Sequence, residues 1–206
     1  MIQIYGSPRT SASRCYLTLE EIGIPYEAAP LDMMEKREHK SASYLKLNPN
    51  GKVPCLVDGD FVLWESVAIN TYLAEKYKPE LLGKTPEEKG LVQQWSLWAL
   101  SELQAPLVDL IIQTVFTPEP KRNAEIIAKA REKVPPLLTI LDSALANKDF
   151  MVGKSLTLAD LNMASVVNIA PNFGFAIEEY MNLNQWMQKM KGRPAFQRLL
   201  NARGGR

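Results

Sequence analysis

The sequence predicts an α/β domain followed by an all-α helical domain. In the first 79 residues, short apolar runs separated by Gly- and Pro-containing turns give the order strand–helix–strand and then strand–strand–helix. Residues 80–88 are polar and contain Gly83 and Pro86, which is typical of a linker. Beyond it, apolar residues recur at helical spacing. We therefore expect domains at 1–79 and 89–206, joined by a linker at 80–88.

The first elements follow from local patterns. Residues 2–5 alternate apolar and polar and predict a strand. Cys15, Leu19 and Ile22 form one apolar stripe of a helix, which Gly23 ends. A second strand is expected over 25–31, and the strand–helix–strand order favours a parallel pair. A charged segment and a short helix or turn at 41–47 follow.

The stretch 48–77 carries the strongest ligand signals. It predicts a strand over 54–57, a turn at 58–60, a second strand through Trp64 and then a helix. Pro54 opens the first strand, a position compatible with a cis bond to Val53. Ser66 stands where it can cap the helix beside free N–H groups. This corner suits a carboxylate and predicts a small peptide ligand.

The second half reads as helices. Pro106 predicts a kink in the first of them, residues 117–120 break it, and Pro135-Pro136 are expected to interrupt the next, over 121–147. Thr157 and Asp160 form a capping box before an apolar run. Two more helices are expected near 177–190 and 194–202.

Composition excludes several classes of protein. The 206 residues are 46% hydrophobic with a net charge of +1, which fits a soluble globular protein and predicts no nucleic-acid or membrane partner. No apolar run approaches the roughly 20 residues of a membrane span, and the N-terminus lacks a signal-peptide pattern. The two cysteines form no CxxC motif, which favours a reducing cytoplasm. The single histidine argues against a metal site, so no metal is expected.

Four motifs together carry a family resemblance: the NPNGKVP turn (48–54), the WES corner (64–66), the pair His39-Lys40 and the SLTLAD capping box (155–160). On these motifs the chain resembles a bacterial cytosolic glutathione S-transferase of the serine/threonine type along essentially its whole length. The resemblance implies a thioredoxin-like first domain that binds glutathione as cosubstrate and a helical domain that shapes the electrophile site. It also implies a cytoplasmic homodimer with a role in detoxification.

The resemblance also implies a set of glutathione contacts. Glu65 and Ser66 match the motif for the γ-glutamyl end, and Val53-Pro54 matches the cis-proline loop that pairs with the cysteinyl backbone. Cationic contacts to the glycyl carboxylate fall on His39, Lys40 and Lys52, although Lys40 is equally compatible with a plain solvated surface.

Catalysis requires a group that stabilises the glutathione thiolate, because a free thiol with a pKa near about 8.5 is mostly protonated at neutral pH. The family places a Tyr, Ser or Cys in the loop before the first helix. This chain offers Ser11 there, with Thr10 second, and Ser13 as an N-cap or first-turn residue. Cys15 and Cys55 are expected in the core, and Trp95 and Trp98 either in the core or in the electrophile pocket.

Three functions follow from these features. The first is conjugation of the glutathione thiolate to a small apolar electrophile. The alternatives are glutathione-dependent reduction of a disulfide or peroxide, and a non-catalytic interaction module of the same fold.

Overall fold

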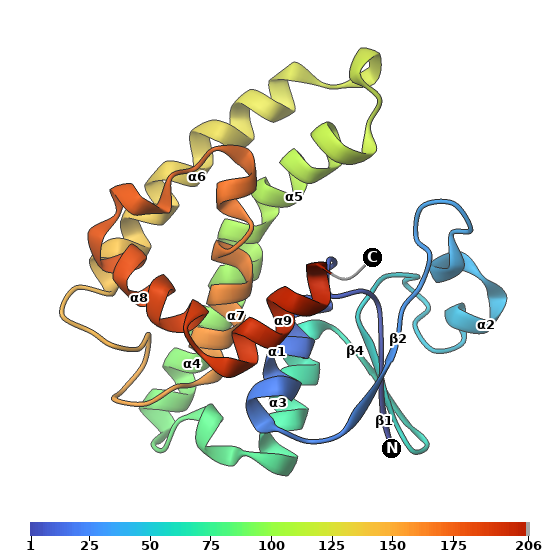
Figure 1. Ribbon diagram of the computed structural model, residues 1–206, viewed down its shortest axis with the longest axis horizontal. Helices are drawn as coiled ribbons and strands as arrows, with labels where there is room; N and C mark the ends of the chain where they lie inside the picture. Colours follow the sequence, from blue (N-terminus) through green and yellow to red (C-terminus); the bar gives the residue numbers. More distant parts are fainter. Residues whose placement is uncertain (205–206) are drawn as a thin grey trace. The chain divides into compact units, whose positions relative to one another are not determined.

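The computed structural model describes residues 1–204, which form two compact units (Figure 1). The first unit comprises Met1–Leu82 together with the segment that begins at Lys191, and the second is Gly83–Met190. These boundaries differ from the expected ones, because the last helix groups with the first unit and a helix already begins at Pro86, inside the expected linker.

The first unit is built on a four-stranded sheet with the strand order β2-β1-β3-β4, whose members are β1 (Ile2–Tyr5), β2 (Tyr26–Ala29), β3 (Cys55–Asp58) and β4 (Phe61–Trp64). β2 is parallel to β1, whereas β3 is antiparallel to β1 and to β4. The predicted parallel pair and the hairpin are therefore confirmed. The β3–β4 register places Cys55 opposite Trp64, so the hairpin delivers the chain directly to the next helix.

Two helices of this unit lie side by side, namely α1 (Ser13–Ile22) and α3 (Ser66–Tyr77) (Figure 1). α9 (Pro194–Gly204) packs against α1, and Arg193 binds both carboxylate oxygens of Glu21 at 2.6 and 3.0 Å. The shorter elements are α2 (Ala42–Leu45) and 3-10 turns at Glu38–Lys40 and Pro79–Leu82. Ile4, Leu56 and Ile69 are fully buried and form part of the core between sheet and helices.

The second unit is helical. One continuous helical run contains α4 (Pro86–Trp98), a π-helical segment (Ala99–Gln104), α5 (Ala105–Ile111) and a second π-helical segment (Ile112–Phe116). α4 packs against α7 and α5 against α6. The remaining elements are α6 (Ala124–Ala144), α7 (Leu158–Val167), α8 (Met181–Lys191) and 3-10 turns at Glu119–Lys121, Ala170–Phe173 and Ile177–Glu179.

The prediction that Pro135-Pro136 interrupt a helix is wrong, since α6 runs through both prolines. Because proline has no backbone N–H, Pro135 and Pro136 cannot donate to the carbonyls of Arg131 and Glu132, four residues earlier. Both of these residues are exposed, so water can bind their carbonyls instead. A buried stripe also continues across the proline pair, consisting of Ala130, Val134, Leu138 and Leu141. Packing of this stripe outweighs the lost hydrogen bonds.

The capping box at the start of α7 is confirmed. The fully buried Asp160 carboxylate accepts hydrogen bonds from the Thr157 backbone and hydroxyl, at 3.0 and 3.1 Å. It also accepts from the backbone N–H of Met151 at 2.7 Å and from Trp186 Nε1 at 3.0 Å. The Asp160 carboxylate thus joins the start of α7 to α8, through Trp186, and to the loop before α7, through Met151.

Among residues 1–204, one helix is long and apolar enough to cross a membrane by length and composition alone, Pro86–Phe116, with a mean hydropathy of 1.2. The apolar pattern of the sequence predicted no run of this length. Core helices of soluble proteins meet the same criterion, and 28% of the most apolar stretch of this helix is buried.

Candidate functional site

The loop after β1 lies against the loop that precedes β3, and both carry predicted glutathione-site residues. Gly6 has a φ of 114°, and a Cβ added there would lie 2.9 Å from the Cβ atoms of both Ala12 and Val53. Only glycine fits this backbone and this space. The close approach brings the hydroxyl-bearing loop, residues 7–12, against the loop that carries Val53.

The structure distinguishes between the two candidate hydroxyls. Thr10 Oγ1 donates to the Ser7 carbonyl at 2.7 Å and accepts from the Ala12 N–H at 3.3 Å, so it closes a turn. Ser11 is half-buried, and its hydroxyl forms no hydrogen bond with the part of the chain that the structure describes. Of the two, Ser11 is the hydroxyl available to a ligand.

The α1 N-terminus lies directly behind this loop. Its N-cap is Ala12, which supplies no side-chain cap, and the first turn carries no acidic residue. Ser13 is the first helical residue and is buried. No side chain caps the start of α1, although the N–H groups of Ser13 and Cys15 donate to the Thr10 and Ala12 carbonyls, both at 2.9 Å. The helix end still presents a partial positive charge beside Ser11.

The Val53-Pro54 bond is cis, as the sequence suggested. The backbone N–H and C=O of Val53 form no hydrogen bond with residues 1–204, although Val53 is half-buried. The neighbouring Lys52 carbonyl, in contrast, accepts from Tyr44 Oη and from Asn48 Nδ2, both at 2.7 Å. The turn is thus held from one side while the Val53 peptide groups stay open to a ligand.

The corner between β4 and α3 differs from the expectation in one respect. Ser66 was expected to cap α3, but the N-cap is Glu65, with φ 74° and ψ 115°, and Ser66 is the first helical residue. A left-handed φ at a non-glycine residue costs roughly 1–3 kcal/mol and is typical of functional sites. The Glu65 side chain is exposed, whereas Ser66 is buried at the helix N-terminus.

One residue of this corner, Arg14, belongs to none of the motifs recognised in the sequence. Its side chain is buried, and its Nη1 donates to the Ser66 hydroxyl oxygen. The Arg14 carbonyl accepts from Asn70 Nδ2 at 3.3 Å, and Cys15 Sγ approaches the Ser66 carbonyl at 3.7 Å. Arg14 could have been noticed in the sequence as a cation in the first turn of a helix, beside Cys15 of the apolar stripe. Such a cation is unusual, because the first turn of a helix favours acidic residues.

The cationic candidates lie around the turn at 48–51. A Cβ added at Gly51 would lie 2.8 Å from both the His39 carbonyl and Lys40 Nζ, so the pair packs directly on this turn. Lys40 Nζ donates to the Asn50 carbonyl at 3.3 Å, which engages its ammonium group. His39 Nδ1 is buried without a hydrogen-bond partner among the described residues. Burial, Lys40 and Arg37 lower the pKa of His39, so its ring is neutral at pH 7. Lys52 is exposed.

Both cysteines are buried and free. Burial raises the pKa of Cys15 to about 12 and that of Cys55 to about 11, so both thiols are protonated at neutral pH. In the helical unit, Trp95 and Trp98 are half-buried and their rings meet edge to face at 5.6 Å. Among residues 1–204, no group of three or more His, Cys, Asp or Glu side chains is arranged to hold a metal ion.

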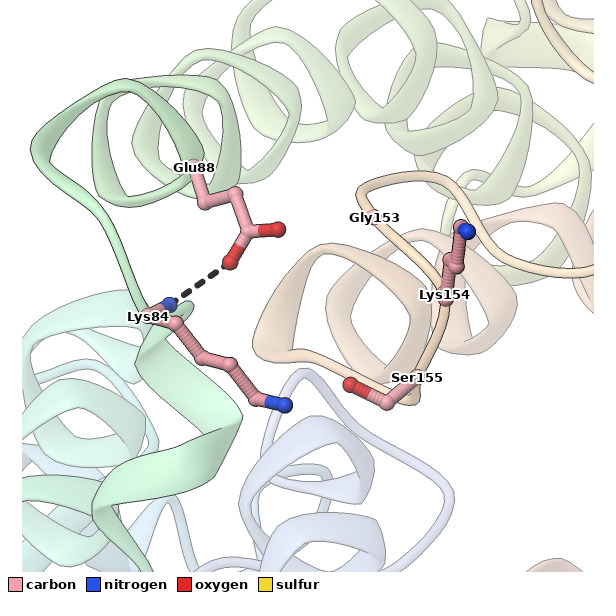
Figure 2. A pocket seen from close by; sticks show the side chains of 5 residues that line it. All are labelled: Lys84, Glu88, Gly153, Lys154 and Ser155. Carbon is pink, nitrogen blue, oxygen red and sulfur yellow. Dashed lines mark hydrogen bonds between the residues drawn. The ribbon is translucent and has the colours of Figure 1, made fainter.

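A separate pocket lies within the helical unit (Figure 2). It is lined by Lys84, Glu88, Gly153, Lys154 and Ser155, and none of the predicted site residues lines it. Glu88 accepts from the Lys84 N–H at 2.7 Å, while the Lys84 side chain extends toward Ser155 (Figure 2). The backbone N–H of Glu88 also donates to the hydroxyl oxygen of the N-cap residue Thr85. The hydrogen bonds of Glu88 are therefore those of an ordinary helix start.

Comparison with known proteins identifies the family. Residues 2–75 match the family model described as the glutathione S-transferase N-terminal domain, and residues 103–194 match that of the C-terminal domain. Glutathione S-transferase F10 of Arabidopsis thaliana is 34% identical over 204 residues, which cover 95% of this chain and 94% of that protein. Glutathione S-transferase GstB of Escherichia coli is 30% identical, covering 97% and 98%.

A solved structure gives the same result. The theta class glutathione S-transferase of Xanthomonas axonopodis pv. citri, determined with glutathione bound, superimposes with a TM-score of 0.85 at 34% identity, covering 96% of this chain and 95% of that one. The resemblance to the glutathione S-transferase family is confirmed, and so is the thioredoxin-like domain followed by a helical domain. This chain belongs to the glutathione S-transferase family.

Proposed function

We propose that this protein is a glutathione transferase that conjugates the glutathione thiolate to small apolar electrophiles. The observation that carries the proposal is that three unsatisfied or ligand-facing groups converge around the start of α1. They are the Ser11 hydroxyl, the Val53 peptide groups and the Ser66 corner of α3. A tripeptide with a carboxylate at one end and a thiol in its middle matches this set.

The γ-glutamyl end is assigned to the β4–α3 corner. The N–H groups of the first turn of α3 and the Ser66 hydroxyl suit the α-carboxylate, since helix N-termini bind anions. The exposed Glu65 carboxylate suits the α-ammonium. The left-handed φ of Glu65 fits this role, because at this corner the Glu65 side chain is exposed while that of Ser66 is buried.

The cysteinyl and glycyl parts are assigned to the neighbouring loops. The open Val53 N–H and C=O pair with the cysteinyl backbone, in the manner of an added β-strand. Among the cationic candidates for the glycyl carboxylate we rank His39 and Lys52 first, because Lys40 already donates to the Asn50 carbonyl. A neutral His39 ring can still donate one hydrogen bond.

We assign the catalytic hydroxyl to Ser11. Lowering a thiol pKa by about two units requires a preference of about 2.7 kcal/mol for the anion. A hydroxyl hydrogen bond to an anion contributes roughly 1.5–3 kcal/mol, and the α1 N-terminus adds roughly 0.3–1 kcal/mol. The two together suffice. Thr10 is less suitable, since its proton already binds the Ser7 carbonyl.

The helical unit is assigned to the electrophile. Ile112, Val115 and Phe116 are exposed apolar residues of one π-helical segment, and π segments are frequent at functional sites. Exposed apolar surface of this kind suits a small apolar electrophile or a subunit contact. We further propose that the protein is a homodimer and that it is cytoplasmic; the free cysteines fit a reducing cytoplasm.

The proposal is tested by two assays on the wild-type protein. Formation of a conjugate from glutathione and a chromogenic aryl halide is expected, together with retention on immobilised glutathione. Reduction of a mixed glutathione disulfide that is much faster than conjugation would favour the reductase alternative. Absence of glutathione binding would contradict the transferase and favour an interaction module.

A further inference from the structure

Tyr16 connects α1 to the end of β1. It is the fourth residue of α1 and is 3% exposed, and its hydroxyl donates to the Gly6 carbonyl at 2.8 Å. The Ile4 carbonyl lies 3.4 Å from the same hydroxyl oxygen and is the weaker second acceptor. Because Gly6 directly follows β1, the side chain of a helical residue holds the point at which the chain leaves the sheet.

The hydroxyl-bearing loop, residues 7–12, lies between the two places that Tyr16 contacts. At the start of the loop, the Tyr16 hydroxyl binds the Gly6 carbonyl. At the end of the loop, the backbone N–H of Tyr16 donates to the Ala12 carbonyl at 3.0 Å. Ser11 directly precedes Ala12 in this loop. One residue therefore fixes both ends of the loop that carries the proposed thiol-activating hydroxyl.

Gly6 also faces the loop that carries Val53. A Cβ added at Gly6 would lie 2.9 Å from the Cβ atoms of Ala12 and Val53, so these backbone segments are in close contact. A displaced Gly6 peptide would move Ser11 relative to Val53, to which the cysteinyl backbone of glutathione is assigned. A misplacement of about 1 Å can cost as much as about 100-fold in rate, so the bond from Tyr16 to Gly6 bears on catalysis.

The Tyr16 hydroxyl keeps its proton at the pH values used for conjugation. Burial, and to a smaller extent the neighbouring Cys15, raises the pKa of Tyr16 to about 12. The Tyr16 ring is also held in place, because it packs against the Tyr26 ring with 5.7 Å between the centroids. The bond to Gly6 is therefore a neutral contact that does not titrate together with the thiol of glutathione.

We propose that Tyr16 is a positioning residue for the thiol-activating hydroxyl: by donating to the Gly6 carbonyl, it holds Ser11 within reach of the glutathione sulfur. This inference rests on the proposed function. It implies that the Tyr16 hydroxyl favours ionisation of the bound thiol and contributes little to the affinity for glutathione, because the contacts assigned to Val53 and Ser66 come from other elements.

The test removes the Tyr16 hydroxyl and follows the bound thiol. In Tyr16→Phe, the pKa of the thiol is measured at saturating glutathione from the ultraviolet absorbance of the thiolate. This pKa is expected to rise by about one unit, and kcat for an aryl halide at neutral pH is expected to fall roughly tenfold. The dissociation constant of glutathione, measured by calorimetry, should change less than about twofold, because it reports the other contacts.

A double-mutant cycle shows whether Tyr16 acts through Ser11. If it does, adding Tyr16→Phe to Ser11→Ala should raise the thiol pKa no further than Ser11→Ala alone. Tyr26→Phe is the matched control, because it also removes a tyrosine hydrogen bond of the first unit, the one from Tyr26 Oη to Glu20 at 2.6 Å. This bond does not involve the hydroxyl-bearing loop, so the thiol pKa and kcat should stay at their wild-type values.

The outcomes separate this inference from the proposed function. If wild-type protein neither binds nor conjugates glutathione, the proposed function itself fails. If wild-type protein conjugates glutathione and Tyr16→Phe lowers only the Tm, Tyr16 is structural and the inference is overturned. Independent, additive shifts in the double mutant would overturn it as well. If Tyr16→Phe does not fold, Tyr16→Met, which also lacks the hydroxyl and has a flexible side chain, carries the same comparison.

Discussion

The sharpest consequence of the site geometry concerns the Ser11 hydroxyl. Replacing Ser11 by Ala removes one oxygen that forms no hydrogen bond within the described chain, so the fold should be nearly unaffected. If the hydroxyl stabilises the thiolate of bound glutathione, the pKa of that thiol must rise. The matched variant is Thr10→Val, because Thr10 bonds to Ser7 and Ala12 instead.

The expected magnitude follows from the strength of one hydrogen bond. A bond to a charged group contributes roughly 1.5–3 kcal/mol, and each pKa unit corresponds to about 1.4 kcal/mol. Ser11→Ala should therefore raise the thiol pKa by about 1–2 units. Because the thiolate is the nucleophile, conjugation near neutral pH should fall about five- to fiftyfold, and the loss should shrink as the pH rises above about 9.

The assay is the pH dependence of kcat/KM for conjugation of an aryl halide, measured for wild type and both variants. Ser11→Ala should shift the profile to higher pH without a comparable change in the dissociation constant of glutathione. Thr10→Val should keep the wild-type profile and lose about 1 kcal/mol of stability. An unshifted profile in Ser11→Ala, or a shifted one in Thr10→Val, would refute the assignment.

Two further predictions concern stability. Asp160→Asn should lower the free energy of unfolding by about 3–5 kcal/mol, since an amide places a donor against the buried donors of Met151, Thr157 and Trp186. Calorimetry should show a lower Tm for this variant. The control Asp149→Asn, at an exposed position, should leave the Tm unchanged. Hydrogen bonds from Lys76 and Tyr72 lower the pKa of Asp58. Its stabilising contribution is therefore present above the unfolded pKa of about 3.9 and is lost as the pH falls through the lower folded value. Asp58→Asn should destabilise the protein in urea at pH 7 and much less at pH 3, and an equal effect at both would contradict this.

The hairpin and its flanking helix were predictable because their signals are local. The turn at 58–60, the apolar runs on either side and the serine at the start of the helix fix β3, β4 and the start of α3 within a few residues. The cis bond before Pro54 and the capping box at Asp160 were also readable from short motifs. Each depends on neighbours within about four positions.

The features that the sequence did not reveal depend on contacts between distant residues. Arg14 reaches Ser66 across 52 positions, and no local pattern encodes that pairing. Ser66 was expected to cap α3, but the left-handed backbone of Glu65 moves the cap by one residue. Pro135 and Pro136 favour a break, yet the buried stripe of α6 outweighs them. Similarly, the choice between Thr10 and Ser11 required the turn that occupies the Thr10 hydroxyl.

The central claim is that Ser11 contacts the sulfur of glutathione held between Val53 and Ser66. A crystal structure of the protein with bound glutathione tests it most directly. We predict Ser11 Oγ within about 3.2 Å of the sulfur, the Val53 N–H and C=O paired with the cysteinyl residue, and the α-carboxylate at Ser66. A sulfur contacted by Thr10 instead, or glutathione bound away from Val53 and Ser66, would contradict the account.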